Sequence, residues 1–461
     1  MNRSLFLFLS CLLLLSAGCA GSGGRYNTDA LTKDLISAEE TAKRYGINTV
    51  WWTGYGSAAL NTTVTLAQER NINLARSAIA VNRALYQARL LSADLVPNFS
   101  GDASAQASRS LDSGNASPTW RQGWEGGVSV SYELDLWRRL RDAADAAEWE
   151  YRATVEDLIS ARLALVNSVV SGWFYLAYTE QAIIVAERAE KRYEQLLELA
   201  QNKYRLGKTD SLEMLQAEQA LLSARNNTSS LRAERADAAQ AMRNLLNLRP
   251  GESLEQENAD LLAIPVVPVN LNVPLAALSA RPDIHAAEAR VQNAFKTLEA
   301  DRSAWYPGIS VGSTLNVSAD KARNFFDVPV LSGLVSLSLP FLDWNRLYWN
   351  VKISRADFET ATLNLEETVT TALNDVDAAC AAYVEARLTL EQTLAKHERD
   401  VRIAGYYKER YENGAAELKD YLDARNTADS SALSALSSKY TLLSRESGIY
   451  MAVGGRYEPL E

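Results

Sequence analysis

The sequence predicts a mainly helical chain with a smaller β portion, built from two copies of one large unit. The second half repeats the first at an offset of 207 to 210 residues, so that Tyr204–Gly207 corresponds to Tyr411–Gly414. No proline interrupts residues 119–249 or 341–458, and both windows are rich in helix-favouring Ala, Leu, Glu, Arg and Gln. Short runs outside these helices alternate apolar and polar residues, which is the period of a strand. Two copies of so large a unit predict a quasi-symmetric object around a central axis, not a solenoid of short repeats.

The start of the chain is typical of an exported protein. Arg3 precedes an apolar run from Leu5 to Leu15 that is too short to span a bilayer as a helix and suits a signal peptide. Ser16-Ala17-Gly18-Cys19 resembles the lipobox of bacterial lipoproteins, in which the cysteine is acylated. We therefore expect a signal peptide at 1–18, a covalent lipid on Cys19, and a lipid-anchored segment at 19–65. The alternative is an ordinary signal peptide cut nearby, with Cys19 incidental.

The charge of the chain argues against nucleic acid as a partner. Removal of residues 1–18 takes away Arg3 and changes the net charge from −10 to −11. Only Cys19 and Cys380 then remain, so no intrachain disulfide framework is expected if Cys19 carries a lipid. Cys380 stands in an Ala-rich helical stretch, where a small buried packing role is expected.

Each predicted unit contains a helix, two strands and two long helices. The first unit, 66–265, has strands at 97–109 and 123–136 and long helices at 138–204 and 209–248. The second unit, 266–445, has strands at 307–319 and 331–340 and long helices at 345–411 and 415–445, followed by a closing segment at 446–461. A helix over 138–204 would be about 100 Å long, which does not fit inside a compact domain. Apolar residues at spacings of three and four predict coiled-coil packing, and ordinary antiparallel hairpins are the simpler interpretation.

The alternating runs suit strands that cross a membrane. In one of them Val128, Val130 and Tyr132 alternate with Ser129 and Ser131, and each run has roughly the ten residues that a tilted membrane strand needs. Aromatic residues at the ends of the runs are typical of membrane-interface girdles: Trp120, Trp124, Trp137, Trp305, Tyr306 and Trp344. Four strands are too few to close a barrel, and an open sheet edge cannot face lipid. Several chains would therefore have to share one barrel; a water-soluble sheet with one wet face is the alternative.

Several short motifs in a fixed order together resemble a known family. They are Cys19 in the lipobox, Trp51-Trp52 with Leu60-Asn61, Asn71–Leu74, Tyr132–Trp137, Arg281–Ile284, the two Tyr-x-x-Gly turns and the closing Gly454-Gly455. In these the chain resembles the outer-membrane factors, the TolC-like efflux ducts, and within them the lipid-anchored subgroup near OprM and NodT. The resemblance implies a homotrimer in which three sets of four strands form a 12-stranded β-barrel in the outer membrane. It also implies an α-helical barrel of long helices that extends into the periplasm.

The resemblance further implies an exit duct of a tripartite efflux system. The partners would be a periplasmic adaptor (membrane fusion) protein, an inner-membrane pump of the RND type, and outer-membrane lipid. The adaptor would dock at the helical turns, on Lys203, Tyr204, Arg205, Leu206, Gly207, Lys208, Tyr411, Asn413, Gly414 and Ala415. The alternative is that the two glycines only satisfy turn geometry.

Asp420 and Asp423 correspond in position to the acidic aperture gate that the resemblance implies. A spacing of three places both carboxylates on one helix face, so three chains would bring six carboxylates to a narrow throat. Their mutual repulsion would favour bound cations or protonation, and a negative throat would favour the entry of cations. Solvated acids on a helix surface are the alternative. Glu213 and Gln216 occupy the equivalent sites in the first unit, where Asp210–Glu213 also resembles a capping box.

The sequence gives little support for an enzyme, a metal site or a bound cofactor. It contains two histidines, His285 and His397, and no Cys/His spacing typical of metal ligands. Gly207-Lys208-Thr209 has the end of a P-loop, but Asn202 stands where the first glycine should be. The main competing function is a lipid-anchored periplasmic coiled-coil scaffold without a channel, which would leave the four alternating runs unexplained.

Overall fold

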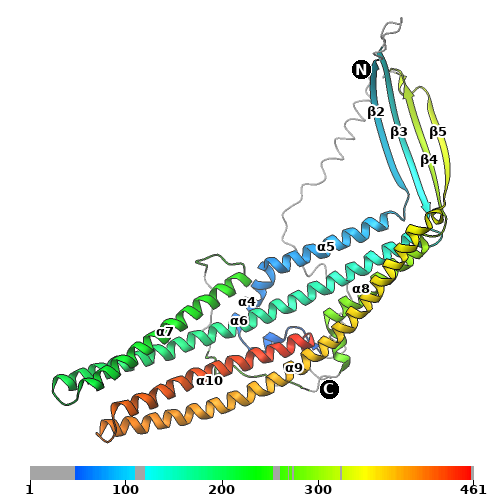
Figure 1. The fold of residues 1–461 in the computed structure, drawn as a ribbon. Helices are drawn as coiled ribbons and strands as arrows, with labels where there is room; N and C mark the ends of the chain where they lie inside the picture. The colour runs from blue at the N-terminus through cyan, green and yellow to red at the C-terminus, as the bar shows by residue number, and fades with distance from the viewer. Residues whose placement is uncertain are drawn as a thin grey trace.

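The structure, a computed structural model, describes residues 47–109, 120–252, 260–267, 269–271, 275–321 and 324–457. The expected signal peptide and Cys19 lie outside these residues. The described chain is elongated, with a sheet at one end and long helices that lead away from it to two helical turns at the other (Figure 1).

Both units contain a helix, two strands and two long helices in that order, which confirms the predicted fold class. The first unit comprises α4 (Ala58–Arg70), α5 (Ile72–Ala93), β2 (Asn98–Arg109), β3 (Trp120–Leu134), α6 (Arg139–Arg205) and α7 (Ser211–Leu245). The second comprises η2 (Leu275–Ala280), α8 (Pro282–Ser303), β4 (Gly308–Ala319), β5 (Pro329–Ser338), η4 (Pro340–Asp343), α9 (Trp344–Glu412) and α10 (Leu418–Val453). Three short elements, β1 (Ile47–Asn48), η1 (Trp51–Tyr55) and β6 (Arg456–Tyr457), complete the described chain.

The long helices have the length that their composition predicts. α6 has 67 residues and α9 has 69, so each spans about 100 Å at roughly 1.5 Å per residue. α10 continues to Val453, beyond the expected end at 445, because Ile449, Tyr450 and Val453 are buried. Gly454 then ends it with a φ of +83°, a conformation that glycine adopts without a steric penalty.

The shorter helices α5 and α8 begin at the two aligned motifs and make the same contact in each unit. The side chain of Asn71 caps α5 by accepting from the N–H of Leu74, and it also donates to the carbonyl of Leu245 at 2.8 Å. In the second unit Arg281 precedes α8 and donates to the carbonyl of Ala452 at 2.7 Å. Both carbonyls lie at the ends of the last helices, so each motif joins the start of one helix to the end of another.

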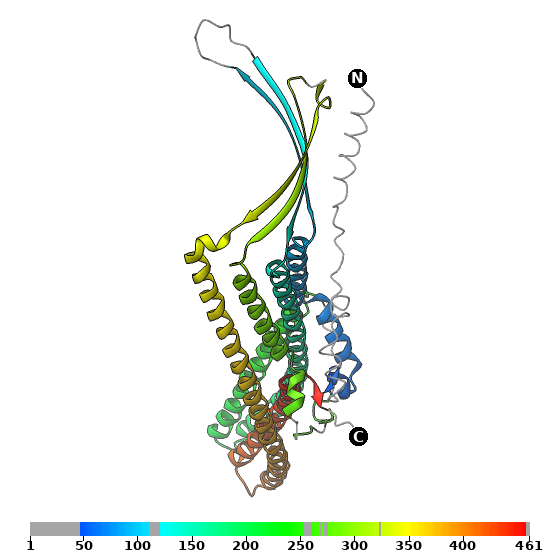
Figure 2. The same cartoon turned by 90° about the vertical axis from the view of Figure 1, so that its right-hand side faces the viewer.

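The four long strands form one antiparallel sheet in the order β2-β3-β4-β5. Its register places Ser100, Ser129, Thr314 and Ser332 in one row and Gly101, Val128, Leu315 and Leu331 in the next. Because neighbouring rows point to opposite faces, one face of the sheet is polar and the other apolar. Figure 2 shows the strands as a twisted ribbon that projects beyond the helices. Within the described residues, β2 and β5 each have one unpaired edge.

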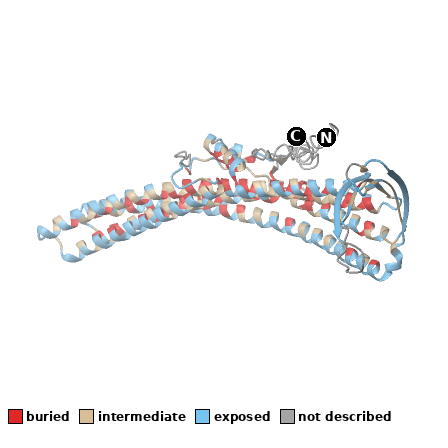
Figure 3. Cartoon of the chain, turned by 90° about the horizontal axis from the view of Figure 1, so that it is seen from above, coloured by how far each residue is buried: buried red, intermediate tan, exposed pale blue. Residues whose placement is uncertain are grey.

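The core lies among the helices and not at the sheet. Buried residues run along the inside of the helical body, whereas the strands are mostly exposed (Figure 3). Halfway along the body, Trp51 and Tyr55 of η1 pack against Phe174 of α6 and Leu443 and Tyr450 of α10, a cluster that we call the belt. The pairing of β1 with β6 joins the two described ends of the chain at this belt.

Candidate functional site

The sheet exposes apolar side chains that a soluble protein would bury. Val128 is 59% and Leu331 74% exposed, although both lie on the apolar face of the sheet. On the polar face the hydroxyl groups of Ser100 and Ser129 are 2.6 Å apart and hydrogen-bonded across the strands. A wall with one apolar and one polar face suits a boundary between lipid and water.

The predicted interface aromatics lie at the two ends of the sheet. At the helical end Trp137 stacks on Tyr306, with ring centroids 4.8 Å apart, and its indole N–H donates to the carbonyl of Pro307 at 3.0 Å. Trp305 lies beside Tyr306 in the connection from α8 to β4, and Trp344 is the first residue of α9. Trp120 and Trp124 stand at the opposite end of the sheet, at the start of β3. The stacked pair joins the connections of the two units.

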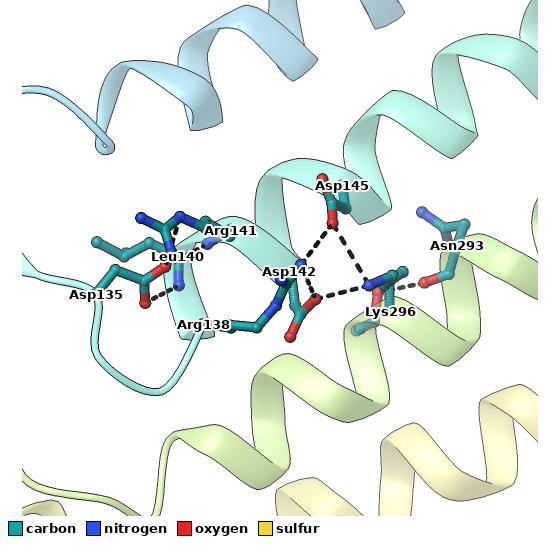
Figure 4. A network of polar contacts seen from close by, with 9 residues as sticks. Asp135, Arg138, Leu140, Arg141, Asp142, Asp145, Asn293 and Lys296 are labelled. Carbon is teal, nitrogen blue, oxygen red and sulfur yellow. Dashed lines mark hydrogen bonds and ion pairs between the residues drawn. The ribbon is translucent and has the colours of Figure 1, made fainter.

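A polar network fixes the angle at which β3 leads into α6 (Figure 4). The carboxylate of Asp135 accepts hydrogen bonds from the N–H groups of Leu140 and Arg141, which begin the helix. Arg138 has a φ of +66°, which is uncommon for a residue with a side chain. These contacts stabilise a sharp turn where strand becomes helix.

The same network connects α6 to α8. Lys296 donates to the buried carboxylate of Asp142 at 2.8 Å and lies 3.4 Å from Asp145 (Figure 4). The hydrogen bond to Asp142 raises the pKa of Lys296, so its ammonium group is charged at neutral pH. The ion pair holds the two units together directly below the sheet.

The far end of the body consists of two helical turns that are largely exposed. Gly207 and Gly414 end α6 and α9 with φ values of +68° and +71°. Among the predicted docking residues, the exposed ones are Tyr204, Arg205, Leu206, Gly207, Lys208, Asn413, Gly414 and Ala415. Tyr411 is buried and Lys203 is half-buried, so these two act inside the tip.

Lys203 and Tyr411 join Glu213 and Thr209 in what we call the tip cluster. Lys203 Nζ donates to the hydroxyl of Tyr411 at 2.6 Å, and that hydroxyl donates to Glu213 Oε1 at 2.9 Å. Lys203 Nζ also lies 3.2 Å from Glu213 Oε1, and Thr209 donates to Glu213 Oε2. Because Tyr411 belongs to α9 and the other members to the first turn, the cluster connects the hairpins of the two units.

The tip cluster keeps its charges over a wide pH range. Burial opposes ionisation of the Glu213 carboxyl group, but the hydrogen bonds from Thr209, Tyr411 and Lys203 outweigh it and lower the pKa of Glu213. Burial likewise opposes the charge of Lys203, and the hydrogen bonds with Tyr411 and Glu213 outweigh it and raise its pKa. The expected capping box is half formed, since Asp210 accepts from the N–H groups of Leu212 and Glu213. The side chain of Glu213 serves the tip cluster.

A second polar contact connects the hairpins farther from the tip. Arg192 of α6 donates to Asp429 of α10 at 2.5 Å, and Arg425 donates to the same carboxylate at 2.9 Å. The hydroxyl of Tyr193 donates to Asn426 at 2.5 Å. The sequence patterns do not single out these residues, because the pairs are separated by more than 230 positions.

Asp420 and Asp423 lie in the first turns of α10, and both are exposed in the single chain. Leu418, Tyr421 and Leu422 are buried on the side of α10 that packs against α6 and α7. The two carboxylates therefore point away from this packed side, as their spacing predicts.

The belt contains a fully buried carboxyl group, that of Glu446 on α10. Its Oε1 accepts a hydrogen bond from Tyr450 at 3.1 Å, and Tyr55, Tyr383 and Arg456 lie near it. Burial raises the pKa of Glu446 to about 7, although the hydrogen bond from Tyr450 partly opposes the shift. The corresponding residue of the first unit, 207 positions earlier, is Ala239.

Comparisons with known proteins agree with this architecture. The family model described as outer membrane efflux protein matches residues 63–248 and 273–455. An uncharacterized protein of Haemophilus influenzae is 41% identical over 99% of both chains, and the toxin and drug export protein A of Aggregatibacter actinomycetemcomitans is 41% identical over 95% of both. The crystal structure of the Campylobacter jejuni outer membrane channel CmeC has a TM-score of 0.83 at 22% identity and covers 89% of both chains.

Proposed function

The chain belongs to the outer membrane efflux protein family, and we propose that three copies join their sheets into a 12-stranded barrel to form its working state. It is an outer-membrane channel, the exit duct of an export system, and it conducts molecules without catalysing a reaction. The observation that carries this function is an open four-stranded sheet with an exposed apolar face, continuous with helices that span about 100 Å. Edge pairing between copies would satisfy the strands that one chain leaves open.

The competing function, a periplasmic coiled-coil scaffold, does not require this sheet. A scaffold would account for α6, α7, α9 and α10, but it would leave the apolar faces of β3, β4 and β5 in water. Burial of such a surface in lipid removes that cost, since apolar area is worth roughly 25 cal/mol per Å².

The cell envelope position that we propose includes a lipid anchor. Acylation of Cys19 in the lipobox would place the start of the mature chain in the outer membrane. Mass spectrometry of the N-terminal peptide, with Cys19→Ala as the matched control, tests this. An unmodified Cys19 in the mature wild-type protein would rule out the anchor.

We assign the docking of a periplasmic adaptor, and through it of an RND-type pump, to the exposed part of the tip. Leu206 and Lys208 in the first turn, with Asn413 and Ala415 in the second, are exposed in the protomer. Leu206→Ser with Ala415→Asp should abolish co-purification with the adaptor and leave the conductance of the trimer unchanged. Retained binding would move the docking surface elsewhere.

We assign the aperture gate to Asp420 and Asp423. Each chain presents both carboxylates on the exposed side of α10, so a trimer would gather six of them at the tip. Repulsion at such a throat is reduced by bound cations or by protonation, which makes the closed state sensitive to divalent ions.

The cargo that we propose is the class named for a close relative, drugs and secreted toxin. The polar face of the sheet carries rows of serine and threonine, which suits a wide water-filled passage. Loss of the gene should raise susceptibility to toxic compounds, and unchanged susceptibility together with unchanged secretion would argue against this cargo.

Two measurements test the duct itself. Unboiled gel electrophoresis of outer-membrane fractions should show a trimer that resists mild SDS, and planar bilayers should show conductance from the same material. A soluble or monomeric lipoprotein without conductance would support the scaffold instead.

A further inference from the structure

The components of the tip cluster occur twice in the chain. At the offset of 207 residues that relates Gly207 to Gly414, Lys203 corresponds to Arg410 and Glu213 to Asp420. Tyr411 corresponds to Tyr204 at the same offset. Each pair keeps its chemical type, namely a base, an acid and a phenol, so the chain carries the parts of two tip clusters.

Only one of the two clusters is complete within a single chain. Tyr411 is 9% exposed and contacts Lys203 and Glu213, whereas Tyr204 is 46% exposed. Arg410 donates instead to the hydroxyl of Tyr406 at 3.0 Å and to the carbonyl of Ala415 at 2.8 Å. The charge of Asp420 contributes to the raised pKa of Arg410, after the hydrogen bond to Tyr406. The base and the acid of the second cluster therefore interact electrostatically, and the phenol that Arg410 contacts, Tyr406, comes from its own helix and not from another unit.

The apolar residues beside the clusters show the same asymmetry. Leu422 is 4% exposed because it packs against the hairpin of the first unit. Its equivalent, Leu215, is 54% exposed. Leu422 of the second unit is thus buried against the first unit, whereas its counterpart in the first unit, Leu215, remains exposed.

The two units repeat contacts as well as elements, since Asn71 and Arg281 reach the equivalent carbonyls of Leu245 and Ala452. In a ring of like units, a contact made by one unit on the unit before it recurs at each boundary. Tyr411 makes this contact at the boundary between the two units of one chain. The next boundary in the ring lies between two copies of the chain.

We propose that Arg410 and Asp420 form a binding site for Tyr204 of a neighbouring copy of this chain, with that copy's Leu215 packed beside it. The tyrosine hydroxyl would accept a hydrogen bond from Arg410 and donate one to Asp420, as the hydroxyl of Tyr411 does with Lys203 and Glu213. The inference rests on the proposed trimer and adds the residues that complete its tip. It also gives Asp420 a partner in addition to its place in the gate.

Site-specific photocrosslinking in the full-length protein tests the site. With p-benzoylphenylalanine in place of Tyr204, irradiation should give dimers and trimers on boiled gels, with mass spectrometry locating the link near Arg410 and Asp420 of another chain. The matched control replaces Tyr411, which should give only products with the mass of one chain. An intact unboiled trimer without crosslinks between chains from position 204 would overturn this inference and leave the duct standing. Absence of any trimer would overturn both.

A double-mutant cycle gives an independent measurement. Tyr204→Phe and Asp420→Asn should each raise the leak conductance, and the double variant should raise it no further than the larger single effect. Independent, multiplying effects would show that the two side chains do not meet and would overturn the inference.

Discussion

Removal of one hydroxyl group should loosen the tip of the duct. In Tyr411→Phe the ring can still stack on Tyr421, with centroids 6.0 Å apart, and can still face Lys203 Nζ at 4.2 Å. The variant loses the hydrogen bonds at 2.6 Å and 2.9 Å that join the hydroxyl to Lys203 and Glu213. Hydrogen bonds to charged groups contribute about 1.5–3 kcal/mol each. Because the Lys203–Glu213 ion pair remains, we expect a net loss of about 2 kcal/mol per chain, which shifts the equilibrium between joined and separated hairpins about 30-fold.

Single-channel recording in planar bilayers measures this shift as an increase in open time without ligand. Tyr86→Phe is the matched control, because it removes the hydroxyl of an exposed tyrosine on α5, outside the tip. Equal open times in Tyr411→Phe and Tyr86→Phe, both close to wild type, would refute the reasoning.

Acid should reproduce the effect in the wild type. The folded-state pKa of Glu213 is lowered, so its contribution is present above the unfolded value of 4.5 and is lost as the pH falls through the lower folded value. We expect the open time to rise as the pH falls below 4.5 in the wild type and to depend less on acid in Glu213→Gln.

Three further outcomes follow from the structure. Asp420→Ala with Asp423→Ala should raise the leak conductance and reduce block by divalent cations, and unchanged recordings would remove the gate assignment. Glu446 has a pKa of about 7 in the folded state and 4.5 in the unfolded state, so its stabilising effect is complete below pH 4.5 and is lost as the pH rises through 7. Glu446→Gln should remove this loss of about 3 kcal/mol. The melting temperature of the variant should then be independent of pH between pH 5 and 8. Val128→Arg on the apolar face should destabilise the barrel by about 2–4 kcal/mol, whereas Ser129→Arg on the polar face should cost little, as measured by unfolding in denaturant.

The elements that follow from local patterns are visible in the sequence, and the contacts between distant segments are not. The proline-free windows and the alternation around Val128 define α6, α9 and the sheet because helix propensity and strand period are local properties. α10 is different: its last turns are held by burial of Tyr450 in the belt and of Ile449 beside Tyr383 of α9, and such burial depends on segments far away in the sequence. The belt carboxyl of Glu446 is hidden for the same reason.

The tip cluster could be predicted from the sequence only in part. The resemblance to the outer-membrane factors places Lys203 and Tyr411 at the tip, but as exposed docking residues, whereas the structure places both against Glu213. The capping pattern of Asp210–Glu213 predicts that the Glu213 side chain caps its own helix, but in the structure that side chain bonds to Tyr411 of α9 instead. The signal that could have identified the cluster is the internal repeat, since a base, a phenol and an acid recur at one offset in both turns.

The two tip contacts differ in strength, and this difference bears on the shape of the aperture. In the complete cluster Thr209 donates to Glu213, but the residue that corresponds to Thr209 is Ala416, which has no hydroxyl group. Arg410 also already donates to Tyr406 and Ala415. The contact proposed between copies therefore has one hydrogen bond fewer and competes with existing ones, so it is the weaker of the two. A ring of alternating strong and weak contacts has threefold and not sixfold symmetry, and each hairpin of α9 and α10 stays close to the first unit of its own chain. Such a ring can open at three boundaries while the contacts inside each chain persist.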